Sequence, residues 1–91
     1  MITLKSAHEI ELMRRAGKIT AAARAVARDM VKPGVTTQQI DKAVHRFITE
    51  QGAIPSFLHY NGYPASVCVS VNDEIIHGIP GKRVLQEGDI V

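Results

Sequence analysis

A chain of 91 residues is long enough for one small domain with a modest core. Its 11 basic and 9 acidic residues give a formal net charge of +2, which argues against a protein drawn to nucleic acid or membranes by charge alone. The single cysteine excludes an internal disulfide and a zinc cage of several thiolates, and no segment is apolar over the roughly 20 residues that a membrane span requires.

The first predicted helix begins after Ser6 and runs to about Val31. Ser6 and Glu9 have the spacing of a capping box, in which each side chain accepts the backbone amide of the other residue. Pro33 and Gly34 end the helix. Apolar residues recur at steps of three and four and predict one buried face. This face consists of Leu12, Ala16, Ile19, Ala23, Val26 and Met30.

Basic residues gather on the opposite face of the same predicted helix. They are Arg14, Arg15, Lys18, Arg24 and Arg28. We interpret them as a solvated face, with contact to RNA as the alternative.

The second predicted helix follows Thr36 and ends near Gly52. Thr36 and Gln39 repeat the capping box, and Gly52 suits a left-handed helix end. A second apolar stripe is formed by Ile40, Ala43, Val44, Phe47 and Ile48. We expect the two helices to pack on one sheet, which makes the fold class α/β (α+β).

After Gly52 the sequence period changes to two, which is typical of strands. Valines at 67, 69 and 71 alternate with small polar residues at 66, 68 and 70. Asn72-Asp73 is a turn pair, and Ile75-Ile76 predicts a return strand that ends at His77-Gly78. Ile90-Val91 begins another predicted strand. The predicted sheet is mostly antiparallel.

Residues 57–80 hold most of the chemically distinctive side chains. Both tyrosines, the only cysteine, one of the two phenylalanines and two of the four histidines lie there. This concentration suggests the wall of a pocket with a polar group beside it.

His77 is the first candidate for chemistry in that segment. A histidine at the end of a strand can exchange a proton with a reacting group near neutral pH. The alternative is a histidine whose ring is satisfied by a nearby backbone carbonyl, and spacing alone favours this alternative.

Tyr60, Tyr63 and Cys68 are candidates for the pocket wall. The tyrosines can line a pocket with their rings, or they can brace a turn by aromatic packing. Cys68 has no neighbour in sequence that would lower its pKa, so a small polarizable wall residue is more plausible than a nucleophile.

Metal motifs within the chain are weak. His8-Glu9 begins like a zinc-protease helix motif but lacks the second histidine. Glu74 and His77 have the spacing of a helical ligand pair, yet they lie in a β-rich stretch where positions three apart point to opposite faces. We therefore predict no metal site built by this chain alone.

The sequence strongly resembles type I methionine aminopeptidases over nearly its whole length. The specific motif is Tyr63-Pro64 followed at a fixed interval by His77-Gly78-Ile79-Pro80. The matching segments are residues 6–14, 16–17, 32–37, 62–68, 72–74, 77–80 and 88–91. Proline-specific peptidases of the same architecture match these motifs less closely.

The resemblance implies the first half of a pita-bread fold, and residues 1–91 are expected to be the N-terminal part of one aminopeptidase domain. Family members use two divalent metal ions of the cobalt, manganese, iron or zinc class, held by two aspartates, a histidine and two glutamates. The first of these aspartates is expected just beyond Val91. Asp89 matches a turn residue of the family and not a ligand.

The resemblance also assigns roles to residues of the segment 57–80. His77 matches the histidine that contacts the scissile amide and helps to stabilise or protonate the leaving nitrogen. Tyr60, Tyr63 and Cys68 match positions that line the methionine side-chain pocket, and Phe57 occupies another wall position.

These matches imply removal of the N-terminal methionine from nascent proteins in the cytoplasm, with ribosome association as a further expectation. The chain alone is expected to be inactive, and the complete enzyme to be monomeric. An isolated piece could oligomerise through open strand edges. The alternative function is a non-catalytic peptide- or protein-binding module derived from this fold.

Overall fold

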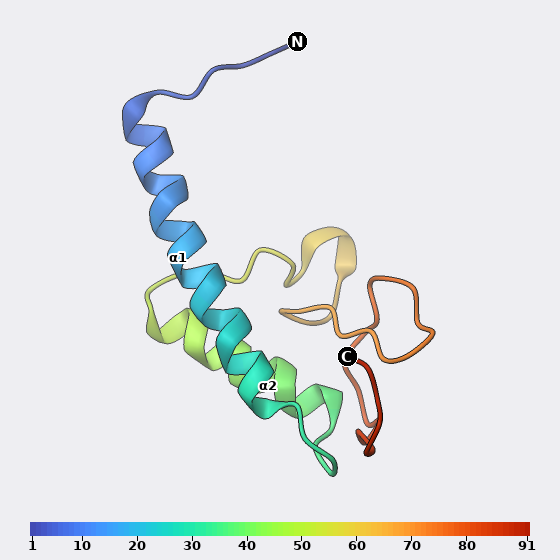
Figure 1. Cartoon of the computed structure of the whole chain (residues 1–91). Helices are drawn as coiled ribbons and strands as arrows, with labels where there is room; N and C mark the ends of the chain where they lie inside the picture. Colours follow the sequence, from blue (N-terminus) through green and yellow to red (C-terminus); the bar gives the residue numbers. More distant parts are fainter.

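The computed structural model describes all 91 residues and contains two α-helices and one short 3₁₀ helix. Helix α1 spans Ala7–Met30, α2 spans Thr37–Glu50, and η1 spans Tyr60–Gly62. The two α-helices pack against each other, and the chain after α2 runs as loops along one side of the pair (Figure 1). None of the helices is both long and apolar enough to cross a membrane.

Both predicted helices are confirmed, together with their capping boxes. The Glu9 amide donates to Ser6 Oγ at 3.2 Å, and the Ser6 amide donates to Glu9 Oε1 at 2.8 Å. At α2 the Gln39 amide donates to Thr36 Oγ1 at 3.1 Å, and the Thr36 amide donates to Gln39 Oε1 at 2.8 Å. These reciprocal bonds satisfy amides that have no partner inside the helix, so local sequence fixes where both helices begin.

The buried stripe of α1 is confirmed only in its second half. Ala23 is buried, whereas Leu12 is 46% exposed and Ala16 is also exposed. Helix α1 has 24 residues and α2 has 14, and the first turns of α1 project beyond α2 and the loops (Figure 1). The prediction that Leu12 and Ala16 are buried is therefore wrong for this structure, because no other element covers them.

The basic face of α1 is solvated, as expected. All five of its arginine and lysine residues are exposed. Arg14 pairs with Glu11 and Arg28 with Asp29, each at 3.3 Å. Such exposed pairs contribute little to stability.

The core lies between α2 and the loops. It consists of Ile40, Val69, Val71 and Leu85. Partly buried Ala27, Met30, Val35 and Val67 pack against it. The valines at 67, 69 and 71 therefore all face inward, as the period of two predicted.

The predicted strands themselves are not formed. The only β-type pairing is an isolated antiparallel bridge between Thr36 and Val84. The Val69 amide donates to the Gly78 carbonyl at 2.8 Å, which is a first contact between the valine-rich segment 67–71 and the isoleucine-rich segment 75–78. Left-handed backbone at Ile76 (φ 38°) and His77 (φ 54°) then turns the return segment out of the extended conformation. Residues 67–71 therefore form no regular ladder with the return segment.

Ile40 is expected to be a main contributor to stability, because its side chain is only 2% exposed and belongs to the core. Ile40→Ala should lower the free energy of unfolding by about 2–5 kcal/mol, the usual cost of such a cavity. Urea unfolding would measure this loss. Ile10→Ala, at an exposed position of α1, is the control and should change stability by less than about 0.5 kcal/mol. Equal effects of the two substitutions would contradict this description of the core.

Candidate functional site

The predicted pocket residues lie in one irregular segment, residues 57–78, which we call the pocket segment. Its first part is closed by a tight turn around η1, in which the His59 amide donates to the Tyr63 carbonyl and the Tyr63 amide to the Tyr60 carbonyl, both at 2.9 Å. The rings of Phe57 and Tyr63 meet edge to face, with centroids 6.2 Å apart. Such T-shaped pairs stabilise a local arrangement of aromatic side chains.

Tyr63 is the centre of this segment. Its hydroxyl donates to the Val67 carbonyl at 2.9 Å and lies 3.3 Å from the Gly78 carbonyl. The tyrosine therefore braces the backbone, which was one of the two interpretations of the sequence. Bracing does not exclude the other interpretation, in which the ring lines a pocket, because only the hydroxyl binds the backbone and the residue remains half-buried.

Gly78 brings the end of the pocket segment against its middle. Its carbonyl accepts the Val69 amide, and its own amide donates to Ser70 Oγ at 3.0 Å. A Cβ atom at this position would overlap the Val69 carbonyl oxygen, so the close approach requires glycine. His77 immediately precedes this contact.

The structure places the five predicted site residues around this network in different ways. Phe57 and Tyr63 are in contact, and Cys68 is a free, half-buried thiol beside Tyr63. Tyr60 is 67% exposed. The His77 side chain is exposed and makes no hydrogen bond within the chain, so the alternative of a carbonyl-satisfied ring is not observed.

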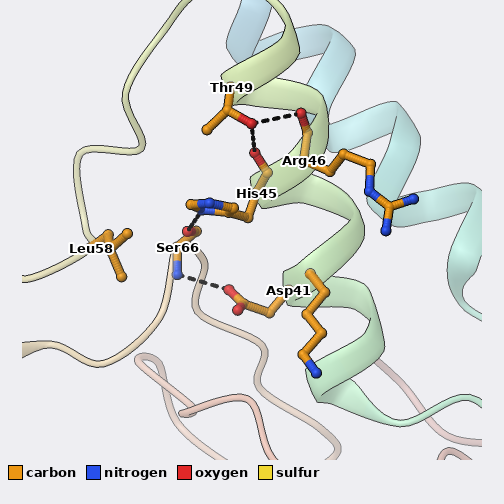
Figure 2. A pocket seen from close by; sticks show the side chains of 7 residues that line it. Asp41, His45, Arg46, Thr49, Leu58 and Ser66 are labelled. Atoms are coloured by element: carbon orange, nitrogen blue, oxygen red, sulfur yellow. Dashed lines mark hydrogen bonds between the residues drawn. The ribbon is translucent and has the colours of Figure 1, made fainter.

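A second polar cluster, between α2 and the pocket segment, was not predicted from the sequence. Asp41 Oδ1 accepts the amides of Ser66 at 2.8 Å and Val67 at 3.1 Å. His45 Nδ1 lies 2.8 Å from Ser66 Oγ, and Figure 2 shows the contacts of Asp41 and His45 with Ser66. Asp41 and His45 are one turn apart on α2, beside the buried Ile40 and Val44. That position beside an apolar stripe is the one signal in the sequence that could have identified them.

This cluster contains the residue types of a serine hydrolase but not their arrangement. Asp41 binds backbone amides and makes no hydrogen bond to the His45 ring, so it cannot orient that ring as a triad aspartate does. The Ser66 and Val67 amides are occupied by Asp41 and cannot serve an oxyanion. The cluster therefore fastens the segment to α2.

An open groove of about 460 Å³ lies beside this cluster. Six of its seven lining residues are polar or charged. They are Asp41, Lys42, His45, Arg46, Thr49 and Ser66, with Leu58 as the apolar member. None of the five predicted site residues lines this groove.

The residues present do not fit a metal centre. No group of three or more histidine, cysteine, aspartate or glutamate side chains is arranged to hold an ion. Glu74 instead accepts the Val71 amide and pairs with Arg83, both at 3.1 Å. Asp89 holds a turn by accepting from the Gln86 amide at 2.8 Å and from Asn72 Nδ2 at 3.0 Å. The hydrogen bond from Asn72 is the main cause that lowers the pKa of Asp89.

The Tyr63 brace predicts a pH dependence at high pH. Burial raises the pKa of Tyr63 to about 12, and the nearby Cys68 and Asp41 add to the shift. Because a free tyrosine has a pKa of about 10, folding favours the protonated phenol, and this contribution to stability is complete below about pH 10 and lost as the pH rises toward 12. Phenolate absorbance would follow the ionisation, and Tyr63→Phe should remove the late transition. Ionisation of Tyr63 near pH 10 in the folded protein would contradict the brace.

Comparison with known proteins gives one consistent result. The model of metallopeptidase family M24 matches residues 11–91. Methionine aminopeptidase 1 of Bacillus subtilis is 50% identical over 91 residues, and the methionine aminopeptidase of Clostridium acetobutylicum is 52% identical over 92 residues. Each alignment covers 100% of this chain and 37% of the relative.

A solved structure agrees with these sequence relatives. The crystal structure of methionine aminopeptidase from Rickettsia prowazekii superposes with a TM-score of 0.94 at 42% identity. The match covers 98% of this chain and 36% of that structure. The chain thus spans a little over a third of the length of the relatives that it matches. Its fold matches the corresponding part of a methionine aminopeptidase, as the resemblance implied, although the predicted sheet is not formed.

Proposed function

Because the chain belongs to metallopeptidase family M24, we propose that its 91 residues form the N-terminal part of a methionine aminopeptidase that removes the initiator methionine from nascent proteins. The observation that carries this proposal is the similarity over 100% of the chain to proteins of that name, at 50% and 52% identity. The activity belongs to the complete domain, since the chain corresponds to 37% of these relatives.

Metal-dependent hydrolysis is proposed with two divalent ions, of the cobalt, manganese, iron or zinc class. These 91 residues lack a ligand cluster, so the ligands would come from the remainder of a complete enzyme. What this chain would contribute is the recognition of the substrate and the imidazole of His77.

Recognition of methionine is proposed for Phe57, Tyr60, Tyr63 and Cys68. A thioether is unbranched and polarizable and packs well against ring edges and sulfur. The edge-to-face pair of Phe57 and Tyr63 offers such surfaces, and the Tyr63 hydroxyl is already engaged with backbone carbonyls. The pocket is thus proposed to select by shape and apolar contact.

His77 is proposed as the group that contacts the scissile amide. Its exposed imidazole has no partner within the chain and is free to donate to a substrate. The Gly78 contact fixes the backbone next to it. The substrates would be methionyl peptides of nascent proteins. The complete enzyme would act on them in the cytoplasm, near the ribosome, as a monomer.

The proposal is tested by measuring the release of free amino acids from short peptides by the full-length protein. We expect metal-dependent cleavage of methionyl peptides and about 10–200-fold weaker cleavage of leucyl peptides, because a shaped apolar pocket discriminates by about 1–3 kcal/mol. Saturable binding of methionyl peptides without any cleavage would overturn the enzymatic proposal and support the alternative binding module.

A further inference from the structure

We propose that Asp41 is a positioning residue for the substrate pocket. Its carboxylate, on α2, holds the Ser66–Val67 peptide in the place from which Tyr63, Cys68 and His77 meet the substrate. This inference rests on the proposed function, because it assigns a new role within the same site.

The carboxylate is committed to the pocket segment. Oδ1 accepts two consecutive amides, Ser66 at 2.8 Å and Val67 at 3.1 Å, and Asp41 takes part in none of the three salt bridges of the chain. Hydrogen bonds to an ionised acceptor are about twice as strong as those between neutral groups. The half-buried position of Asp41 limits competition from water.

A predicted site residue binds the peptide group that follows, Val67–Cys68. The Val67 carbonyl accepts the Tyr63 hydroxyl, which also reaches the Gly78 carbonyl. Tyr63 is thus part of this hydrogen-bond network, and two other predicted site residues adjoin it in sequence. Cys68 directly follows Val67, and His77 directly precedes Gly78.

His45, one turn further along α2, also binds the pocket segment, but through a side chain. It contacts the Ser66 hydroxyl at 2.8 Å, whereas Asp41 contacts the backbone (Figure 2). A side-chain hydroxyl can rotate without moving the peptide, so the contact of His45 constrains the backbone before Cys68 less than the contacts of Asp41 do.

The test uses the full-length protein and three variants. Asp41→Ala removes the acceptor and should raise KM for a methionyl peptide about tenfold, because the pocket would be less well preorganised for its substrate. It should also reduce the preference for methionyl over leucyl peptides. Asp41→Asn keeps an oxygen acceptor and should restore most of both properties. Asp29→Ala removes an exposed helical carboxylate paired only with Arg28 and should leave them unchanged.

A second measurement follows amide hydrogen exchange at Ser66 and Val67. Exchange should accelerate at both residues in Asp41→Ala and stay close to wild type in Asp41→Asn. A lower kcat with unchanged KM and unchanged peptide preference would show only a smaller folded fraction and would overturn the positioning role. If Asp41→Ala does not fold, wild-type exchange at Ser66 and Val67 that is as fast as in exposed loops would overturn it equally.

The two proposals fail in different ways. A wild-type protein that cleaves no methionyl peptide would overturn the proposed function, and the hold of Asp41 on the peptide would then be judged from the exchange rates. Cleavage by the wild type, with Asp41→Ala equal to it in KM, preference and exchange, would overturn the positioning role alone.

Discussion

Replacement of His77 by alanine in the full-length protein is expected to lower kcat for methionyl peptides by about 10²–10⁴-fold, the usual contribution of a positioned acid or base. The imidazole is exposed, makes no hydrogen bond within the chain, and adjoins the Gly78 contact that fixes its backbone. Steady-state kinetics over a range of peptide concentrations would separate kcat from KM.

Backbone effects must be separated from loss of the imidazole, because His77 has φ 54° and asparagine tolerates such a conformation better than alanine does. His77→Asn should therefore show the same loss of kcat with less strain. His59→Asn, at another exposed left-handed histidine of the pocket segment, should retain wild-type kcat. An unchanged kcat in both His77 variants would remove the role assigned to this residue.

Residues 1–91 alone are expected to release no methionine from a peptide, with any of the proposed divalent metals present. A catalytic metal site commonly needs three protein ligands, and no such group exists in this chain. Quantification of free methionine after long incubation would test this expectation, with the full-length protein and the same metals as the positive control. Release that a chelator abolishes, from the 91 residues alone, would contradict it.

Local signals in the sequence predicted the helices well. Capping boxes and helix-ending glycines act within three or four residues, and both helices begin where those signals lie. The burial of Leu12 and Ala16 was predicted wrongly because a stripe shows which face could be buried, but not whether a partner covers its whole length. The strands failed for a similar reason, since a ladder depends on neighbours distant in sequence and on the backbone at Ile76 and His77.

The candidate site likewise has one part that local sequence predicts and one part that depends on contacts distant in sequence. Its pocket segment could be identified from the clustering of aromatic residues, cysteine and histidine, which the sequence displays directly. Asp41 and His45 show in the sequence only their position beside the apolar stripe of α2, because their partners lie 21 to 26 residues away in the chain. Only the fold brings that turn of α2 against Ser66 and Val67. The roles of the five predicted site residues stay predictions.

The most direct test of the account is a crystal structure of the full-length protein with an uncleavable methionyl peptide analogue bound. We expect the methionine side chain to lie within about 4 Å of Tyr63, Cys68 and Phe57, the distance of apolar contact. The His77 imidazole should lie within about 3 Å of the scissile amide group, as a hydrogen bond requires. A methionine side chain bound in contact with none of these residues would contradict the account.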